Sequence, residues 1–450
     1  MKKLRTLLLS GLIAAALPLF APEPADAAVA VKRVVSPGGI EAWLVQDRSV
    51  PVLALQFAFR GGTALDPKGK EGLAELTVDL LDEGAGDLDS QAFQGKVQDL
   101  GAQMSFSAGL DSIQGGVFVL TDRRDEVMGL LKLALTEPRF DDEAVARVKG
   151  QLFAMLSQAQ ESPRRLVREA FNKAVFGEHP YARRTEGTVD GLKAVGRDDL
   201  KGLVQSRFTR DHLLVTAVGD IDEQELATLL DRTFGSLPAE GGPTEVADAA
   251  VNDRGQTIVI DKAIPQSTVS FGQQGIRRDD PDIYAALVMN YVLGGGGFSA
   301  RLTNEVRDKR GLAYSVGSSL VAYDHAALIV GSVGTANDRV GESIALIRAE
   351  WQKMRDKGIT ADELKDAKSY LTGSYLTGIG SSSALAGTLL SYRLDKRPID
   401  YLESRNALIE KVTLADANRV AKALLKPDQL VFVIVGQPKG VAATAAAPAP

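Results

Sequence analysis

Two side chains in the second half of this chain have the chemistry to stabilise an oxygen atom that becomes negatively charged. Arg307 lies in a segment predicted to be a helix, 300–310, and Tyr314 lies at the start of a predicted strand. Gly311 separates them and is expected to end the helix, because glycine adopts the backbone angles that stop one. A guanidinium and a phenol on either side of such a turn could direct two hydrogen-bond donors at one oxygen.

A run of glycines precedes the helix that carries Arg307. It follows another predicted helix, 281–293, and could bind an extended peptide, because a backbone without side chains lets a second backbone approach closely. Ser299 is a suitable N-cap for the next helix. A phosphate loop is disfavoured, because no Lys-Ser or Lys-Thr pair follows the glycines. The candidate substrate-binding residues are Gly294, Gly295, Gly296, Gly297 and Phe298.

Residue types alone leave a simpler alternative open. An arginine on the flank of a helix is commonly a solvated or ion-paired surface charge, and a tyrosine at a strand start commonly serves packing. On that interpretation Arg307 and Tyr314 carry no chemistry.

The elements that position these residues belong to the second copy of an internal repeat. A helix, a glycine, strands and two further helices follow one another in both halves, with Gly101 matching Gly311 and Asp142 matching Asp362. Each half ends on a similar apolar strand with a closing glycine. This order predicts an α+β protein with two homologous domains, each a mainly antiparallel sheet with helices packed on one face.

The segment between the halves, 238–254, is rich in Gly, Pro, Ala and acidic residues and is predicted to be a linker. We therefore expect an N-terminal domain at 28–237 and a C-terminal domain at 255–438. The Ala/Pro-rich tail, 439–450, is predicted to be disordered.

The first residues and the composition limit the classes of function. Residues 1–27 combine basic residues, an apolar run and a cleavage site near Ala27, which predicts a signal peptide and a periplasmic location. That run is too short to span a membrane, so no stable membrane insertion is expected. The 450 residues include 0 Cys, which excludes disulfides, cysteine nucleophiles and thiolate metal sites. A net charge of −6 disfavours nucleic acid as a partner.

The stretch 294–316, GGGGFSARLTNEVRDKRGLAYSV, resembles the C-terminal domain of the pitrilysin/insulinase family of zinc peptidases, specifically the short bacterial members similar to mitochondrial processing peptidase. The resemblance covers nearly the whole chain after residue 27 and implies a pair of related α+β domains that form half of a chamber around a peptide. The first half carries it through RGGT at 60–63, KEGLA at 70–74, ESP at 161–163, FGEHPY at 176–181 and EGT at 186–188.

The chain departs from the family pattern at the zinc site. Catalytic members carry H-x-x-E-H on the helix after Gly-Leu-Ala, where two histidines bind zinc and the glutamate activates water. Here Glu75 and Asp79 occupy the histidine positions and Val78 occupies that of the base. The third ligand, a glutamate in the family, is expected near Ala154 or Met155, where no carboxylate is found. We therefore expect no metal and no cofactor in this chain.

Other residues offer weak alternatives for a metal. Glu75 and Asp79 share a helix face, for which a solvated or arginine-paired role is favoured over loose binding of a hard cation. The histidines have no ligand-spaced partners, which favours local turn or surface roles for His179, His212 and His325.

The resemblance therefore implies the non-catalytic, substrate-binding subunit of a heterodimeric zinc peptidase, inactive alone. A zinc-binding partner would carry H-x-x-E-H, and Arg307 and Tyr314 would act in trans on the scissile carbonyl of a peptide substrate. The alternative is a metal-free peptide-binding or assembly protein with no role in catalysis. An independent peptidase that uses Glu75 and Asp79 as unusual ligands ranks last.

Overall fold

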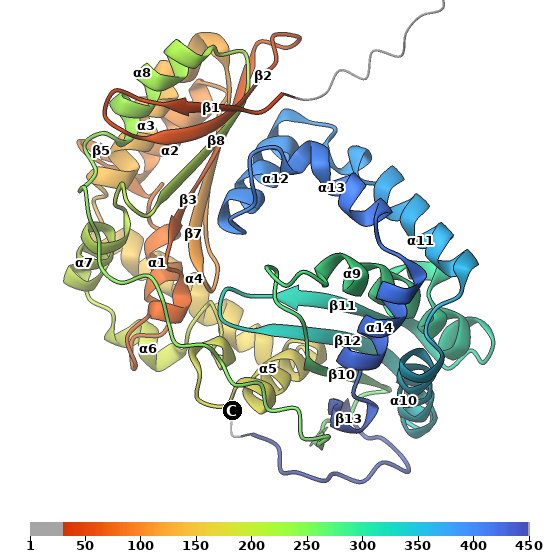
Figure 1. The fold of residues 1–450 in the computed structure, drawn as a ribbon. Coiled ribbons are helices and arrows are strands. Elements are labelled where there is room, and N and C mark those ends of the chain that lie inside the picture. The colour runs from red at the N-terminus through yellow and green to blue at the C-terminus, as the bar shows by residue number, and fades with distance from the viewer. Residues whose placement is uncertain (1–29, 449–450) are drawn as a thin grey trace, which may run out of the picture.

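The computed structural model describes residues 30–448 and contains two large sheets, one in each half of the chain (Figure 1). The predicted signal peptide lies outside the described residues. The strands of the first sheet are β1 Lys32–Val35, β2 Glu41–Gln46, β3 Val52–Arg60, β6 Gln103–Ala108, β7 Ser112–Leu120 and β8 Leu213–Gly219, and β4 Gly84–Ala85 pairs separately with β5 Leu88–Asp89. Those of the second sheet are β9 Thr257–Asp261, β10 Gln266–Gln274, β11 Ala313–Ala322, β12 Ala327–Ala336 and β13 Val431–Gly436.

The two sheets have the same design. The first runs β1-β2-β8-β3-β7-β6 and the second β11-β12-β10-β13-β9. Neighbouring strands are antiparallel except β2 with β8 and β13 with β9, which are parallel. The predicted α+β class with mainly antiparallel sheets is confirmed.

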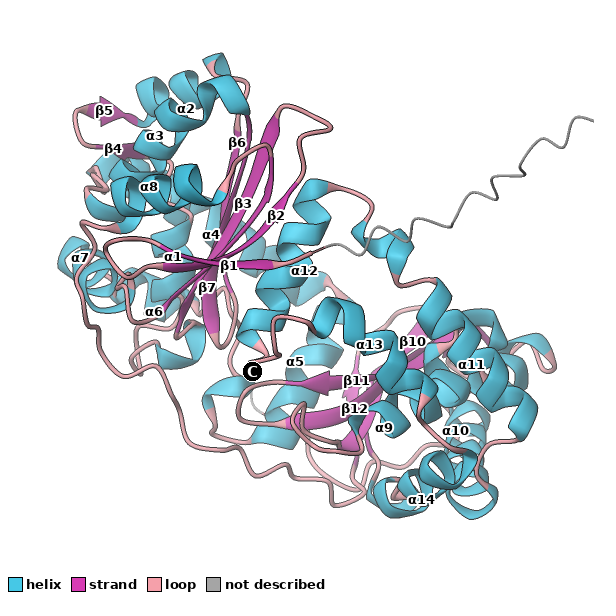
Figure 2. Ribbon diagram, turned by 45° about the horizontal axis from the view of Figure 1, so that its top comes forward, coloured by secondary structure: helices cyan, strands magenta, loops and turns pink. Residues whose placement is uncertain are grey.

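Most helices cover one face of the sheet of their own half, where they build its hydrophobic core (Figure 2). The first half contributes α1 Leu73–Val78, α2 Ser90–Asp99, α3 Arg124–Thr136, α4 Asp142–Glu161, α5 Pro163–Phe176, α6 Val189–Ala194, α7 Arg197–Arg207 and α8 Glu223–Phe234. The second contributes α9 Ile283–Asn290, α10 Val340–Lys357, α11 Ala361–Gly373, α12 Ser382–Leu394, α13 Tyr401–Glu410 and α14 Leu414–Leu424.

Helices α5 and α12 are exchanged between the halves. Helix α5, which begins with the N-cap Ser162 and Pro163, packs on β10 and β13 of the second sheet. Helix α12 packs on β3 and β8 of the first sheet, where Thr216 Oγ donates a hydrogen bond to the backbone oxygen of Ala386 over 2.9 Å. Each sheet is therefore covered on its second face by a helix from the other half.

This exchange explains the unbroken apolar run of β13. Strands that alternate hydrophobic and polar residues have one face in water, whereas a continuous run indicates that both faces are covered. Phe432 and Ile434 point to one face of the sheet and join the core of the second half. Val433 points to the opposite face, where it packs with α5. The α5 side chains buried there stabilise the junction by roughly 1.5–3 kcal/mol each; they are Val167, Phe171, Val175 and Phe176.

The predicted linker and tail have no helix or strand, yet both contact the second half. In the linker, the Ala249 amide donates to the backbone oxygen of His325 over 2.8 Å. In the tail, Thr444 Oγ accepts from the Thr257 amide over 2.8 Å, and the Thr444 amide donates back to the Thr257 oxygen. These bonds connect Thr444 to the first residue of β9, and disorder of the tail stays a prediction.

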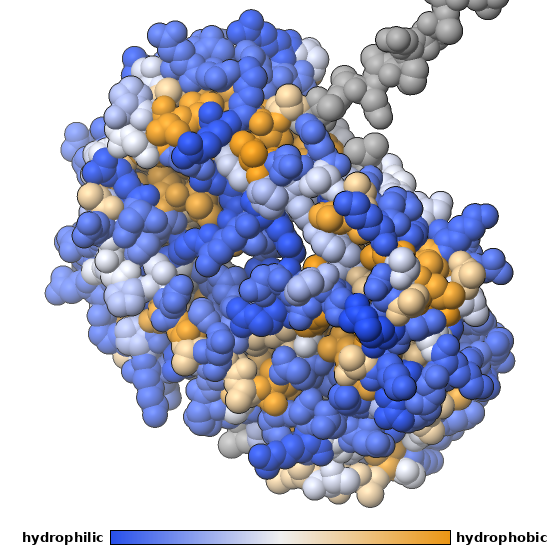
Figure 3. All heavy atoms as spheres, viewed as in Figure 1, coloured by the Kyte–Doolittle hydropathy of each residue, from blue (hydrophilic) through white to orange (hydrophobic). Residues whose placement is uncertain are grey.

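No helix among residues 30–448 is long and apolar enough to cross a membrane. The face in Figure 3 is mostly hydrophilic, with hydrophobic side chains gathered over β1, β2 and α8.

Candidate functional site

The glycine turn packs closely against β11. A Cβ atom added to Gly294 would lie 2.4 Å from Ser318 Oγ and 2.6 Å from the Ser318 amide nitrogen. Asn290 at the end of α9 holds Ser318, because Ser318 Oγ donates to its Oδ1 over 2.8 Å and its Nδ2 donates to the Ser318 oxygen over 3.2 Å. Gly294 is therefore required for contact between the end of α9 and the strand.

The next glycines differ in what they face. Added Cβ atoms on Gly295 and Gly296 would meet atoms of α9 and of the turn after it at 3.0 and 2.8 Å. Gly297 has a φ of +58° and no such neighbour within 4 Å, and Phe298 beside it is 76% exposed. The room for a second backbone that the sequence predicts is thus found at Gly297, and peptide binding along the run stays a prediction.

The helices around the turn differ from their predicted bounds. Helix α9 starts at Ile283, because Asp280 accepts from the Asp282 amide over 2.8 Å and forms a turn ahead of the helix, and the chain continues as a π-helical turn, Tyr291–Gly295. The segment 300–310 contains a π-helical stretch, Thr303–Asp308, and Ser299 does not cap it. The widened turn preserves the predicted buried face, since Leu302 and Val306 are both 0% exposed.

Arg307 lies on the outer side of this π-helical stretch. Its Cζ atom is 4.9 Å from the centre of the Phe298 ring, and its Nη1 is 3.2 Å from Asp308 Oδ1. The side chain is 32% exposed. Gly311 ends the helix as predicted, with a φ of +60° and its amide bonded to the Arg307 oxygen over 2.7 Å.

Tyr314 stands out of the sheet because of a bulge. Ala313 pairs with Thr335 and Ser315 pairs with Gly334, so Tyr314 is the extra residue of β11 between them. A bulge re-aims a side chain at the edge of a sheet, and Tyr314 is 87% exposed. The strand start is fixed at Leu312, whose oxygen accepts from Thr335 Oγ over 2.5 Å.

The result is a surface on which a guanidinium and a phenol follow each other across one short turn. Within the described residues, neither the Tyr314 hydroxyl nor the Arg307 guanidinium forms a hydrogen bond to the sheet or the core. Such an arrangement can offer two donors to a polar group of another molecule. Their convergence on one oxygen stays a prediction.

Two of the zinc-motif positions at α1 carry half-buried carboxylates, Glu75 and Asp79. Burial, together with the charges of the neighbouring carboxylates of Asp79, Glu186 and Asp66, raises the pKa of Glu75 to about 7. Burial, followed by the charge of Asp82, raises the pKa of Asp79 to about 6. Within residues 30–448 no arginine pairs with Glu75 or Asp79, so the arginine-paired interpretation is not supported. Val78, at the position of the base, is 2% exposed.

These residues do not fit a catalytic zinc. Zinc in such a site takes three protein ligands, commonly with histidine, and leaves an open position for water. No group of three His, Cys, Asp or Glu residues in the described chain is arranged to hold a metal ion. Position 154 on α4, where the third ligand is expected, is an exposed alanine.

Several known proteins are similar to this chain over much of its length. A family model described as "Peptidase M16 inactive domain" matches residues 194–371. The "Non-peptidase homolog YmxG" of Helicobacter pylori is 28% identical over 395 residues, which are 88% of this chain and 91% of that protein. A crystal structure of a peptidase M16 inactive domain from Pseudomonas fluorescens is 26% identical, covers 93% of this chain and 100% of that one, and has a TM-score of 0.85. The chain is thus similar to the M16 peptidase family, and the family model matches part of its first half and most of its second.

At the positions of the M16 zinc motif the chain has Glu75, Val78 and Asp79, a pattern expected of a non-catalytic homologue. Similarity also extends to relatives with a different name, since an "Uncharacterized zinc protease" of Bacillus subtilis is 21% identical over 354 residues, 79% of this chain and 86% of that protein. The name of a relative therefore does not decide activity, whereas the residues at the M16 zinc positions do bear on it.

The three histidines of this M16 homologue make local contacts. His179 Nε2 bonds to the Ala247 oxygen over 2.7 Å, and His325 Nδ1 lies 3.1 Å from Asp248 Oδ1, so both hold the segment between the halves. His212 Nε2 is 3.5 Å from the carboxylate of its neighbour Asp211.

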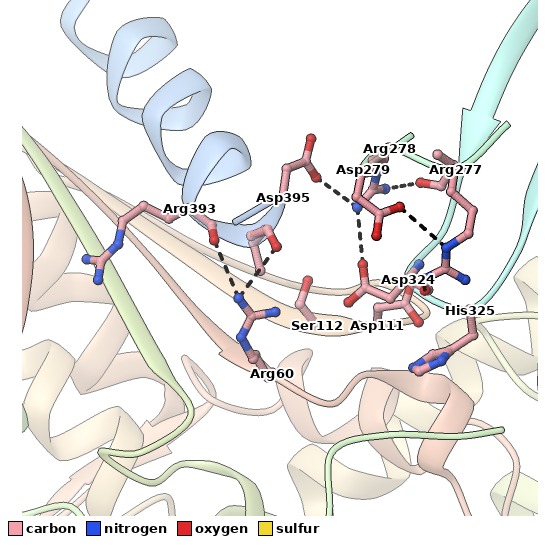
Figure 4. Close-up of polar contacts among 12 residues, drawn as sticks. Arg60, Asp111, Ser112, Arg277, Arg278, Asp279, Asp324, His325, Arg393 and Asp395 are labelled. Atoms are coloured by element: carbon pink, nitrogen blue, oxygen red, sulfur yellow. Dashed lines mark hydrogen bonds and ion pairs between the residues drawn. The ribbon is translucent and has the colours of Figure 1, made fainter. Parts of the chain in front are cut away.

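Sequence reasoning missed a polar network where the two halves of the M16 fold meet (Figure 4). The Tyr181 hydroxyl donates to Asp111 over 2.5 Å and accepts from the His325 amide over 3.1 Å. Asp111 also accepts from the Asp324 amide over 3.1 Å. The β6–β7 and β11–β12 turns are thereby joined, and Arg278 links Asp324 to the end of α12 through Asp395. The motif FGEHPY contains Tyr181, but only the fold reveals its partners.

A cavity of about 880 Å³ opens between the first sheet and the segment that precedes α12. Its lining includes Gln46, Phe118 and Ser381 and none of the residues from 294 to 316. The cavity therefore does not belong to the Arg307 and Tyr314 site.

Proposed function

We propose that this chain is the non-catalytic, substrate-binding subunit of an exported, heterodimeric zinc peptidase. A homologous partner would supply H-x-x-E-H with its zinc and activated water. This chain would supply Arg307 and Tyr314 to the oxygen of the scissile carbonyl in a bound peptide. The signal-like residues 1–27 support a periplasmic location for the pair.

The observation that carries the proposal is the bulge at Tyr314. A tyrosine placed for packing would be buried in the sheet, whereas Tyr314 is removed from the ladder and is 87% exposed. Exposing a large aromatic side chain beside a second, partly exposed donor is expected where another molecule covers both. Arg307 lies on the element that precedes this strand, joined to it through the Gly311 turn.

The chemical task of the two side chains is electrostatic. When water attacks a peptide carbonyl, negative charge develops on its oxygen, and donors that already point at this position stabilise the transition state more than the substrate. One such donor contributes about 3 kcal/mol in comparable acyl-transfer sites. Buried Val78 stands at the position of the base and carboxylates stand at those of the two histidines, so the H-x-x-E-H chemistry would have to come from the partner.

The test is to mix the purified chain with a co-exported H-x-x-E-H homologue and to measure cleavage of peptides by each protein alone and by the mixture. We expect cleavage by the mixture only, and loss of most of it with Arg307→Ala or Tyr314→Phe. If the partner cleaves equally well alone, the in-trans role is wrong. If the chain binds peptides but stimulates no peptidase, the metal-free peptide-binding function replaces it.

A further inference from the structure

Phe298 is a large apolar side chain with no place in the hydrophobic cores of the described residues. It lies on the short turn Gly297–Ser299 and is 76% exposed. None of the hydrophobic clusters built from residues 30–448 includes it. Its position must therefore be explained by what its ring contacts.

The ring contacts the guanidinium of Arg307. The Cζ atom of Arg307 lies 4.9 Å from the ring centre, within the range in which the ring's quadrupole attracts a cation. Asp308 holds the same guanidinium through its Oδ1, 3.2 Å from Nη1. A flexible side chain with several rotatable bonds is thus held by an aromatic face and one carboxylate.

Two neighbouring arginines on the same segment are held differently. Arg301 makes a two-pronged contact with Glu363, at 2.7 and 2.6 Å, and its side chain is only 13% exposed. Arg310 donates to the Glu305 carboxylate and to its backbone oxygen at 2.6 and 2.8 Å. These two have structural partners, whereas Arg307 rests on a ring that is itself exposed.

We propose that Phe298 is a positioning residue for Arg307. Its ring holds the guanidinium beside the glycine turn, so the conformation of the turn and the direction of Arg307 are coupled. Gly297, with a φ of +58° and no atom within 4 Å of an added Cβ, leaves room for the turn to change conformation. Holding the side chain in advance lowers the entropy lost when Arg307 binds an oxygen atom. The effect on cleavage rests on the proposed function, but the contact itself does not.

The contact is tested in the isolated full-length chain by the rate at which phenylglyoxal modifies Arg307, measured by peptide mass spectrometry. Phe298→Leu keeps an apolar side chain and removes the ring, and Phe298→Tyr keeps the ring. We expect modification of Arg307 to accelerate roughly two- to five-fold with Phe298→Leu, the range for losing an exposed cation–π contact. Phe298→Tyr should retain the rate of the unsubstituted chain.

Arg301 provides the control, because its ion pair with Glu363 reports whether the segment stays folded. Its rate should be the same in all three proteins. If Phe298→Leu leaves the rate of Arg307 unchanged, or if Phe298→Tyr accelerates it as much as Phe298→Leu, the positioning role is wrong.

A second readout joins this role to catalysis. In a mixture with the zinc-bearing partner, Phe298→Leu should lower kcat several-fold with little change in KM, and Phe298→Tyr should restore it. If the unsubstituted chain stimulates no cleavage while the modification rates follow the expected order, the proposed function fails and the positioning role stands.

Discussion

The guanidinium of Arg393 donates to the backbone oxygen of Val215 over 2.7 Å, so that a helix of the second half is bonded to the middle of the first sheet. Arg393 also bonds to the backbone oxygen and the carboxylate of Glu41, at 2.9 and 3.1 Å. These bonds hold the exchanged helix α12, and with it the arrangement of the two halves.

Replacing Arg393 tests that junction. Its side chain is 7% exposed, and Arg393→Ala removes bonds to buried backbone oxygens, so we expect the free energy of unfolding to fall by about 2–4 kcal/mol. Arg33 is the matched control, because it pairs with the same Glu41 but is 64% exposed. Arg33→Ala should cost less than about 1 kcal/mol. Equal effects in urea denaturation would contradict the role given to Arg393.

Phe171 tests the reciprocal helix. It lies in α5, is 3% exposed and packs on the second sheet, so Phe171→Ala should cost about 3–5 kcal/mol. The chain has 2 Trp, and Trp351 is fully buried in the second half. In a Trp43→Phe background, urea unfolding followed by the fluorescence of Trp351 should therefore shift to lower urea concentration with Phe171→Ala, although Phe171 lies in the first half. An unchanged Trp351 transition would show that α5 does not stabilise the second sheet.

The sequence predicts the strands and helices of this fold better than it predicts which helix packs on which sheet. The unbroken apolar run of β13 indicates that both faces are covered, and the spacing in α5 indicates one buried face. Their contact joins segments more than 250 residues apart in the chain, and the repeat alone favours packing within each half. The exchange therefore emerges only from the tertiary structure.

In the candidate site, too, local sequence signals predict some features, and tertiary packing sets the others. Gly311 and the strand start at Tyr314 follow from local signals. The bulge that exposes Tyr314 depends on its register with β12, which local patterns do not contain. The close contact of Gly294 with Ser318 is likewise set by the packing of α9 on β11.

Stability should depend on the charge of Glu75. Its folded pKa is about 7, above the value of about 4.3 expected for an unfolded chain, so the stability that it contributes as a neutral group is present at low pH and is lost as the pH rises through 7. Glu75→Gln removes the buried charge and should raise the free energy of unfolding by about 1–3 kcal/mol at pH 8, with a much smaller change at pH 5.

The exposed Glu126→Gln provides the comparison for Glu75→Gln, because its side chain is 65% exposed. It should change stability little at either pH. Urea denaturation at pH 5 and pH 8 measures both variants, and a gain for Glu75→Gln that is equal at the two pH values would refute the assigned titration.

Zinc content tests the vacant motif. The purified chain should hold far less than one zinc per molecule by elemental analysis, because α1 offers two carboxylates and a buried valine. The combined substitutions Glu75→His, Val78→Glu and Asp79→His should still bind zinc weakly, since α4 has no carboxylate at Ala154 or Met155. Stoichiometric zinc in the unsubstituted chain, with chelator-sensitive cleavage by that chain alone, would overturn its assignment as non-catalytic.

The central claim is that Arg307 and Tyr314 act on the transition state of a reaction whose metal belongs to a partner. The most direct measurement is kcat for peptide cleavage by the complex, at saturating peptide and with the affinity between subunits measured in parallel. Tyr314→Phe and Arg307→Ala should each lower kcat roughly 100- to 1,000-fold and leave subunit affinity unchanged. Variants that assemble normally and keep the full kcat would contradict the claim.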